Sequence, residues 1–225
     1  MPEFGSAQTL PLPFAHADLV CLHAPVQDLT HTLTAAESAA ISSAVDKRRK
    51  EYATGRWLAH RALSQLGLSI ESILSGEKRE PVWPESTVGS ITHADGLVAV
   101  AVSAKPNVLG VGIDLERAGR VGDLLLRKIL TQRERQQLGD LDPTLIFSAK
   151  EACYKVLFPI FREYVPFQAV EIPVDESKST FTMRYLGDRP DHAVIERARG
   201  SYQRLDGCWL TLVVLEAPAE ARVKT

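Results

Sequence analysis

The sequence predicts an α+β protein, and two observations support this fold class. Helix-forming segments come first in each half of the chain and strand-forming segments follow them, so helices and strands do not alternate regularly. This order occurs twice, which indicates two similar halves, although no residue-level repeat accompanies it. Lys105-Pro106-Asn107 interrupts two apolar runs, so we expect an amino-terminal subdomain over 1–107 and a carboxy-terminal subdomain over 108–225.

The first half begins with an irregular stretch over residues 1–33, in which we expect one short strand. Thr34-Ala-Ala-Glu37 matches a capping box and predicts a helix through about Val45. A second helix is predicted over 47–66, because its apolar residues recur at helical spacing and a glycine follows. Gly76 to Pro84 is predicted to form a loop, since it contains glycine and two prolines.

Three strands are predicted in the middle of the chain. Val88 to His93 and Leu97 to Ser103 are short strand-like runs, and Asp95-Gly96 between them is a turn signal typical of a hairpin. Val108 to Glu116 is rich in Val, Ile and Leu and predicts the third strand.

The second half contains a long helix with clear start signals. Thr131-Gln-Arg-Glu134 is a second capping box. Asp142 as N-cap and Pro143 at the first helical position then begin a helix that runs to about Phe158 and is expected to stop at Pro159. Strands are predicted over the remaining runs 168–174, 179–186, 192–199 and 208–216.

The composition excludes several classes of protein. The 225 residues are 45% hydrophobic and 24% charged, and the formal net charge is −2, which gives no reason to expect general nucleic-acid binding. No apolar run approaches the roughly 18 residues of a membrane span, and no signal peptide is recognised, so we expect a cytoplasmic protein. The cysteines are odd in number and far apart, which indicates reduced thiols: Cys21, Cys153 and Cys208.

Two carboxylates share one face of the predicted strand Gly110 to Glu116. Because side chains alternate along a strand, Asp114 and Glu116 point the same way, with their Cα atoms about 6–7 Å apart. This spacing can flank a divalent cation, and Mg²⁺ prefers carboxylate and phosphate oxygens. The alternative is a strand end with two solvated acids, and the motif taken alone favours that alternative.

The long helix changes this balance. Glu151 and Lys155 are four residues apart and lie on one helical face, with Lys150 adjacent around the helix. The alternative is an ordinary surface ion pair. The flanking residues, however, are apolar nearly all round, which is typical of a buried helix whose few charges need a partner or a ligand.

Two more segments suit anion binding, each with weak support by itself. Thr92 and His93 end a strand and offer donors to a phosphate oxygen, although a lone strand-end histidine is more often structural. The basic run Lys47 to Lys50, followed by Arg56, suits a phosphate clamp, although charge runs on helices are usually solvated faces. Both interpretations stay open at this point.

Together these segments resemble the Sfp-type phosphopantetheinyl transferases. Gly112-Ile-Asp114-Leu-Glu116 is similar to the family's acidic strand, and Phe147-Ser-Ala-Lys150-Glu151-Ala-Cys-Tyr-Lys155 is similar to its helix motif at the family's spacing. The segments Arg48 to Arg56 and Arg79 to Pro84, which leads into Gly89 to His93, resemble the enterobactin synthase component D-like branch. The likeness covers residues 34 to 175.

The sequence departs from the family pattern at three positions. Phe147 stands where many relatives have Trp, and Thr92 stands where Ser is common; both changes keep the chemistry. Ser75 stands where some relatives place a basic residue, which puts one phosphate contact in doubt.

The resemblance implies a fold, a reaction and its participants. The fold is a pseudo-two-fold pair of similar α+β subdomains with coenzyme A in the cleft between them. The reaction is Mg²⁺-dependent transfer of 4′-phosphopantetheine from coenzyme A to a serine of an apo acyl, peptidyl or aryl carrier protein, which releases 3′,5′-ADP. The implied protein is a monomer with no nucleic-acid or membrane partner, serving siderophore, nonribosomal peptide, polyketide or fatty-acid synthesis.

The resemblance also implies the site residues, in four groups. The metal ligands are Asp114, Glu116 and Glu151. The catalytic residues are Asp114, Glu151, which takes the serine proton, and Lys155, which holds the pyrophosphate. The coenzyme A contacts are Arg48 and Arg56 at the 3′-phosphate; Thr92, His93, Asp114, Lys150 and Lys155 at the phosphates; and Gly76, Lys78, Arg79, Glu80 and Pro81 at adenine. The carrier contacts, within Ala118 to Leu130, are Arg120, Leu124, Arg127 and Lys128.

Other functions remain open beside this one. A non-catalytic coenzyme A or nucleotide-binding regulatory protein is disfavoured by the intact carboxylates and both helix lysines, since pure binding does not need Glu151. A magnesium phosphotransferase that uses a nucleoside triphosphate is disfavoured because no GxxxxGK[ST] loop occurs. An α+β interaction domain is the third alternative. For Ala118 to Leu130, an amphipathic helix that packs its leucines inward carries equal weight with carrier docking.

Overall fold

The computed structural model describes residues 7–10, 19–188 and 192–218. The chain divides into two compact units, which separate between Lys105 and Pro106. We describe each unit by itself, and call them the amino-terminal unit and the carboxy-terminal unit.

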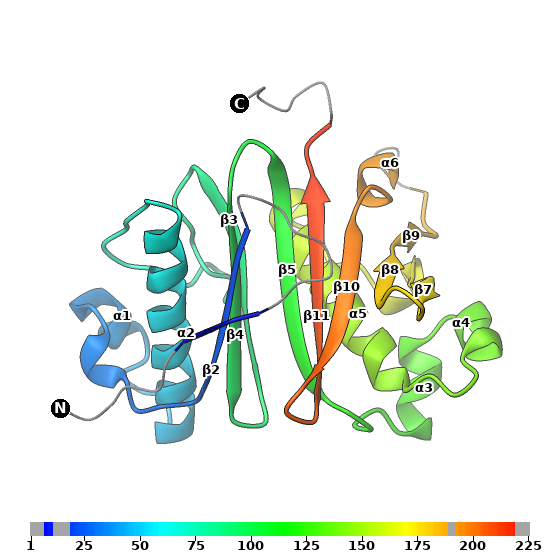
Figure 1. Ribbon diagram of the computed structural model, residues 1–225, viewed down its shortest axis with the longest axis horizontal. Coiled ribbons are helices and arrows are strands. Elements are labelled where there is room, and N and C mark those ends of the chain that lie inside the picture. The colour runs from blue at the N-terminus through cyan, green and yellow to red at the C-terminus, as the bar shows by residue number, and fades with distance from the viewer. Residues whose placement is uncertain (1–6, 11–18, 189–191, 219–225) are drawn as a thin grey trace. The chain divides into compact units, whose positions relative to one another are not determined.

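The amino-terminal unit is an antiparallel sheet covered by one long helix. The sheet has the order β1-β2-β4-β3, and α2 packs against β2 and β4 (Figure 1). The helical elements are η1 (Thr30–Thr32), α1 (Ala35–Ala40) and α2 (Asp46–Gln65). The strands are β1 (Gln8–Thr9), β2 (Leu19–Pro25), β3 (Thr87–Ala94) and β4 (Leu97–Ala104).

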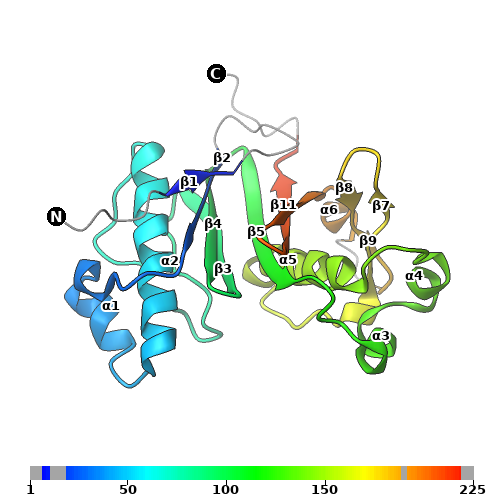
Figure 2. The ribbon, with the colours of Figure 1, turned by 60° about the horizontal axis from the view of Figure 1, so that its bottom comes forward.

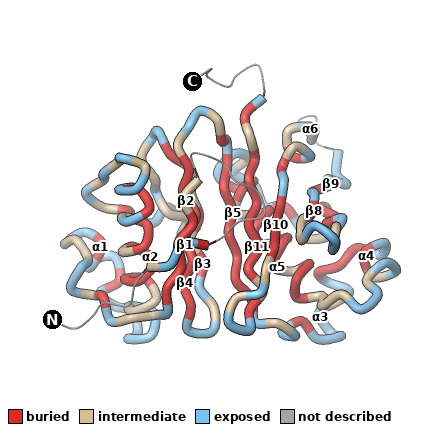
Figure 3. Tube along the Cα trace, in the orientation of Figure 1, coloured by how far each residue is buried: buried red, intermediate tan, exposed pale blue. Residues whose placement is uncertain are grey.

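The core of the amino-terminal unit lies between α2 and this sheet. Figure 3 shows most of β4 and part of α2 as buried. The fully buried residues at the centre come from the helix and from the middle strand β4: Leu58, Ala59, Ala62, Val98 and Val100. Their burial explains why the helical pattern over 47–66 predicts this element correctly.

The carboxy-terminal unit repeats this design with a helix of similar length and a sheet of five strands. Its main sheet has the order β5-β11-β10-β8-β7, and the contacts between neighbouring strands are antiparallel. The helix α5 lies along β5 and β11 on one face of the sheet (Figure 2). The strands are β5 (Val108–Arg117), β7 (Val174–Asp175), β8 (Thr180–Thr182), β10 (Arg199–Leu205) and β11 (Cys208–Glu216).

Short elements flank the main sheet of the carboxy-terminal unit. Two of them, β6 (Val170–Glu171) and β9 (Arg184–Tyr185), pair with each other as a separate ribbon. The helical elements are α3 (Asp123–Ile129), α4 (Gln132–Gln137), α5 (Pro143–Phe161), η2 (Phe167–Ala169) and α6 (His192–Ile195).

Both capping boxes and the Asp142 N-cap are confirmed. The hydroxyl of Thr34 accepts from the backbone N–H of Glu37, and the Glu37 carboxylate accepts from that of Thr34. Thr131 and Glu134 make the same reciprocal pair, and Asp142 accepts from the backbone N–H of Thr144. These predictions succeed because each cap involves residues only two or three positions apart.

Several predicted boundaries are wrong. The first helix ends at Ala40 rather than near Val45, and α5 continues through Pro159 to Phe161. Pro159 has no N–H to donate and its ring crowds the carbonyl group one turn earlier, but so close to the helix end only two more helical residues follow it.

Strand predictions in the second half are also partly wrong. The run 168–174 is divided into η2, β6 and β7, because Pro173 separates the two strands and cannot donate to a ladder. The run 192–199 begins as the short helix α6, and β10 starts only at Arg199. Within residues 1–33 we expected one short strand, and the described part of this stretch contains two, β1 and β2.

Two further expectations concern cysteines and membranes. All three cysteines are buried and free, as the sequence predicts. Among the helices that the structure describes, none combines the length and the apolarity needed to cross a bilayer.

Candidate active site

Two glycines on β5 allow α5 to approach this strand closely. A Cβ atom at Gly112 would collide with the backbone carbonyl oxygen of Ala152 on α5, and a Cβ atom at Gly110 would lie 3.0 Å from Val156 Cγ1. Because glycine has no side chain, the helix backbone can pack directly on the strand at this level. This contact brings the carboxyl end of β5 beside the middle of α5, where Glu151 and Lys155 lie.

Asp114 is the most extensively bonded carboxylate of the site. It is 5% exposed, and its Oδ1 atom accepts from Lys155 Nζ at 2.7 Å. Its Oδ2 atom accepts from Ser148 Oγ at 2.9 Å, and that hydroxyl lies 2.9 Å from Thr211 Oγ1 on β11. Lys155 Nζ also donates to the carbonyl oxygen of Ile113 at 2.9 Å. Asp114 therefore joins β5 to α5.

Sequence reasoning missed Ser148 and Thr211. A signal for Ser148 was available, because it lies three residues before Glu151 and seven before Lys155, hence on the same helical face. Thr211 offered no sequence signal. It reaches the site because β11 pairs with β5 in a register that places Thr211 opposite Asp114.

The pKa values of Glu116 and Glu151 are raised, because their surroundings disfavour the charged carboxylate. Burial is the main cause that raises the pKa of Glu116, and the charge of Asp114 adds to it, while the ion pair with Arg120 opposes the shift. Burial also raises the pKa of Glu151, and the charges of Asp114 and Glu116 add to it, while Lys155 opposes it. The three carboxylates therefore lie near enough to repel one another.

This donor set suits a divalent cation. Mg²⁺ takes oxygen ligands, and a cation among three mutually repelling carboxylates would remove the repulsion. Across the described residues, no three His, Cys, Asp or Glu side chains are already arranged as a metal cage. Instead, Asp114 pairs with Lys155 and Glu116 pairs with Arg120. Before a cation could bind, Lys155 and Arg120 would have to release the carboxylate oxygens of Asp114 and Glu116.

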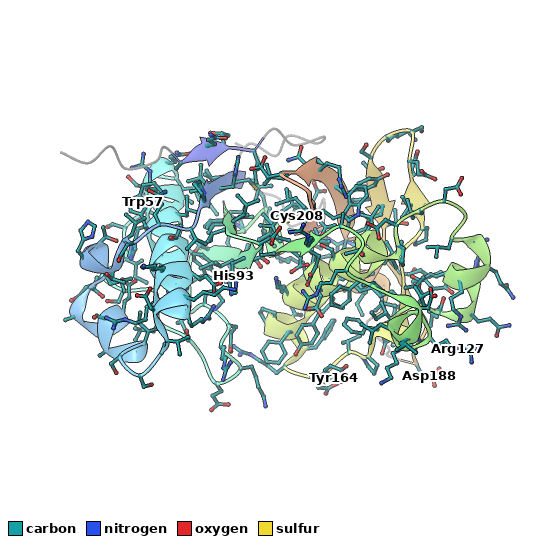
Figure 4. All side chains as sticks on the ribbon, turned by 90° about the horizontal axis from the view of Figure 1, so that it is seen from below. Trp57, His93, Arg127, Tyr164, Asp188 and Cys208 are labelled. Carbon is teal, nitrogen blue, oxygen red and sulfur yellow. The ribbon has the colours of Figure 1, made fainter. Side chains whose placement is uncertain are left out.

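A second cluster of charged residues lies within the amino-terminal unit, between α2 and the end of β3. Arg48 Nη1 lies 2.7 Å from His93 Nε2, and both side chains are near Glu51, at 3.9 Å and 3.5 Å respectively. Figure 4 marks His93 at this end of the strand. Thr92 is 5% exposed and, as the neighbouring residue of the strand, projects from the opposite face. The cluster therefore includes His93 and not Thr92.

Arg56 is a buried cation beside this cluster. It is 5% exposed, its guanidinium carbon lies 4.2 Å from the centre of the Tyr52 ring, and its Nη2 atom donates to Ser75 Oγ at 3.2 Å. Its Nε atom is buried and has no hydrogen-bond partner among the described residues. Burial is the main cause that lowers the pKa of Arg56. An anion at this position would compensate both the buried charge and the unsatisfied donor.

The predicted adenine loop is a tight turn that starts beside Arg56. Ser75 forms an isolated bridge with Pro81, and the Gly76 N–H donates to the Glu80 carbonyl oxygen at 2.8 Å. The Glu80 carboxylate fills the space that a side chain at Gly76 would need, and accepts from the Lys78 backbone N–H at 2.9 Å. The side chains of Lys78 and Arg79 are exposed, and Arg79 has a φ of 67°.

Lys150, which we expected to add positive charge at the phosphates, instead directs its ammonium group to partners inside the carboxy-terminal unit. Lys150 is 2% exposed, and its ammonium group donates to Glu134 Oε2 at 2.6 Å and to the carbonyl oxygens of Ile129 and Phe167, both at 2.9 Å. All three N–H groups are therefore used inside the protein. The physical reason is helical geometry, since consecutive residues project about 100° apart around α5.

The predicted carrier segment exposes apolar and basic side chains together. Leu124 is 93% exposed and Leu125 is 45% exposed, while Arg120, Arg127 and Lys128 are also exposed. Figure 4 labels Arg127 on α3. The inward-packing alternative holds only for part of this segment, because its buried apolar residues lie at the two ends: Val121, Ile129 and Leu130.

Comparison with known proteins identifies relatives along most of the chain. Residues 36–103 match the family model of the 4′-phosphopantetheinyl transferase N-terminal domain, and residues 110–204 match that of the 4′-phosphopantetheinyl transferase superfamily. The 4′-phosphopantetheinyl transferase Svp of Streptomyces mobaraensis is 33% identical over 81% of this chain and 78% of the relative. The 4′-phosphopantetheinyl transferase PptT of Mycobacterium tuberculosis is 32% identical over 80% of this chain and 84% of the relative.

A shorter match links the chain to a third kind of relative. Enterobactin synthase component D of Escherichia coli strain K12 is 37% identical over 48% of this chain and 54% of the relative.

Proposed function

This chain belongs to the 4′-phosphopantetheinyl transferase superfamily, and from that premise we propose how its residues perform the transfer. The chain is a phosphopantetheinyl transferase that modifies carrier proteins, and family membership implies coenzyme A as the donor substrate. In the transfer, a carrier serine hydroxyl attacks the β-phosphorus of coenzyme A and 3′,5′-ADP leaves.

Asp114, Glu116 and Glu151 are the proposed ligands of Mg²⁺. The observation that carries this assignment is that a strand and a helix converge on three carboxylates, two of which have raised pKa values. When bound, Mg²⁺ supplies positive charge that neutralises the pyrophosphate oxygens. The protein's part is to hold the carboxylates in place, and the hydrogen bond from Ser148 to Oδ2 does so for Asp114.

Glu151 is the proposed acceptor of the serine proton. It is partly buried at the middle of α5, close to Asp114 and Glu116, so its carboxylate would lie beside a serine hydroxyl that approaches the pyrophosphate. Lys155 is the proposed pyrophosphate contact. Two of its three N–H groups are used by Asp114 and Ile113, and its side chain is 26% exposed, so the remaining N–H can reach a phosphate oxygen.

The amino-terminal unit is the proposed site of the nucleotide end of coenzyme A. Arg48, Arg56 and His93 would contact the 3′-phosphate, supported by the unsatisfied Nε atom of Arg56. The turn from Gly76 to Pro81 would line the adenine. In this proposal the subdomain over 1–107 recognises the nucleotide, and the subdomain over 108–225 carries the metal site and the carrier contacts.

Carrier docking is proposed on the segment Ala118 to Leu130, which we call the docking segment. Carrier proteins are acidic around the serine that is modified, so Arg120, Arg127 and Lys128 provide complementary charge. Leu124 offers an exposed apolar side chain for the centre of the contact. We further propose that the protein acts as a cytoplasmic monomer.

Incubation with coenzyme A, Mg²⁺ and a panel of apo carriers, followed by mass spectrometry of each carrier, tests the function and its range. Relatives named enterobactin synthase component D favour carriers of siderophore synthesis, so we expect these to gain the 4′-phosphopantetheine mass first. The panel should also contain carriers of nonribosomal peptide, polyketide and fatty-acid synthesis. Binding of coenzyme A without modification of any carrier would instead support a non-catalytic binding protein.

A further inference from the structure

Lys150 and Gln168 converge on the carboxyl end of α3 from two different elements. Lys150 Nζ on α5 donates to the carbonyl oxygen of Ile129 at 2.9 Å. Gln168 Nε2 in η2 donates to the carbonyl oxygens of Leu130 at 2.9 Å and Arg127 at 3.1 Å. Carbonyl groups of a final helical turn have no partner within their own helix, so side chains supply their hydrogen bonds here.

The ion pair between Lys150 and Glu134 connects the Lys150 side chain, which binds the end of α3, to two further segments. Both side chains are buried, at 1% and 7% exposure, and Nζ lies 2.6 Å from Oε2. Glu134 in turn accepts from the backbone N–H groups of Thr131 and Ile172 at 2.8 Å and 2.9 Å. The pair therefore connects α5 to the end of α3, to the start of α4 and to the segment after β6.

The other end of the docking segment is anchored as well. The Gly119 N–H donates to Asp142 Oδ2 at 2.9 Å, and the Val121 N–H donates to Thr144 Oγ1 at 3.1 Å. Both acceptors lie at the beginning of α5. The docking segment is thus held at both ends from one helix, and its exposed leucines lie between the two anchors.

We propose that Lys150 and Gln168 are positioning residues for carrier recognition. They hold the end of α3 in one conformation, so that the exposed Leu124 and Leu125 and the cationic Arg127 are presented to an acidic, partly apolar partner without further ordering. This inference rests on the proposed docking of the carrier at this segment. The two residues affect carrier affinity and leave coenzyme A affinity unchanged, because their hydrogen bonds go to the docking segment and its supports.

Gln168→Ala is the first test, because Gln168 is exposed and its loss leaves the core intact. We expect KM for the apo carrier to rise about 5- to 100-fold, the range for its two lost hydrogen bonds, while KM for coenzyme A and kcat stay unchanged. Amide hydrogen exchange over 127–131 should also become faster. The matched control is Gln65→Ala on α2, an exposed glutamine of the other unit, which should change none of these values.

A paired substitution tests Lys150 without leaving a buried charge alone. Lys150→Met with Glu134→Gln removes both charges, keeps similar volumes and retains a residue suited to the capping box. We expect the same rise in carrier KM with unchanged KM for coenzyme A, measured on protein whose circular dichroism matches the wild type.

The outcomes separate this inference from the docking proposal on which it rests. If Arg127→Glu raises the carrier KM and Gln168→Ala does not, docking at this segment stands and the positioning role is refuted. If neither variant changes the carrier KM, the docking assignment itself fails, and the positioning role fails with it. A rise of KM for coenzyme A in Gln168→Ala would also overturn the inference.

Discussion

Lys155 Nζ and Asp114 Oδ1 lie 2.7 Å apart, and this ion pair joins the helix α5 to the acidic strand β5. Asp114 is a proposed metal ligand, and its bond to Lys155 indicates that the ammonium group of Lys155 neutralises the Asp114 carboxylate when no cation is bound. Ser148 holds the other oxygen of Asp114, so the carboxylate keeps its orientation in either case. The predictions below test the consequences of this arrangement.

Asp114→Ala should reduce transfer by at least about 100-fold, because a bound metal contributes several kcal/mol to the stabilisation of the transition state. The fold should persist, since Lys155 is 26% exposed and can be hydrated, and Ser148 keeps its contact with Thr211. Mass spectrometry of the carrier and circular dichroism measure the two properties. Asp140→Ala, at an exposed position, is the control. Normal modification by the Asp114 variant would remove the metal assignment.

Chelation with EDTA should abolish transfer, and excess Mg²⁺ should restore it. The proposed 3′-phosphate contacts lie in the amino-terminal unit, so chelation should leave part of the coenzyme A affinity in place. Calorimetric titration of coenzyme A with and without Mg²⁺ measures this remainder. Full transfer in EDTA would contradict a metal-dependent mechanism.

Arg48→Ala should raise KM for coenzyme A about 10- to 100-fold, the range for a charge-assisted hydrogen bond. With 3′-dephospho-coenzyme A as the donor, wild type and variant should be equal, because the group that Arg48 would contact is missing. Lys47→Ala is a suitable control, since that side chain is 86% exposed. An equal defect with both donors would show that Arg48 acts elsewhere.

Gly112→Ala should destabilise the protein by about 1–3 kcal/mol and lower transfer as well. The new methyl group would collide with the Ala152 carbonyl oxygen and move α5, with Glu151 and Lys155, away from β5. Urea unfolding and carrier mass spectrometry measure both effects. Gly122→Ala, where a Cβ atom would meet nothing within 4 Å, is the matched control for stability. Unchanged unfolding in the Gly112 variant would contradict the close packing.

Asp142→Asn should lower stability at pH 7, and the difference from wild type should shrink in acid. Burial acts to raise the pKa of Asp142, but the hydrogen bonds from Trp209, Thr144 and Gly119 outweigh it and hold the pKa below 3.8. An acid with a lowered folded-state pKa stabilises above its unfolded pKa, and this contribution disappears as the pH falls through the folded value.

Urea unfolding at pH 7 and near pH 3 checks this pH dependence. We expect Asp142→Asn to lose about 1 kcal/mol at pH 7, the difference between charged and neutral acceptors, since asparagine is an equally good N-cap. A difference that does not shrink in acid would show that the charge of Asp142 is not responsible.

Local sequence determined the features that depend on neighbours a few positions apart. The capping boxes at Thr34 and Thr131 and the Asp142 N-cap were predictable, because their partners are two or three residues away. The shared face of Asp114 and Glu116 follows from the period of a strand, and that of Glu151 and Lys155 from the period of a helix. Family resemblance then supplied the reaction, and with it the roles that we propose for these residues.

Tertiary structure alone decided how these faces combine. Thr211 reaches Asp114 through the pairing of β11 with β5, whose register depends on the whole sheet. Lys150 belongs to the sequence motif, yet its side chain bonds to Glu134 and to the end of α3. The sequence of a helix gives the direction of a side chain around the helix axis, but the packing of the neighbouring elements decides what that side chain contacts. Packing between elements determines the contacts of residues that are far apart in sequence. The hydrophobic pattern of a single helix or strand therefore cannot predict these contacts.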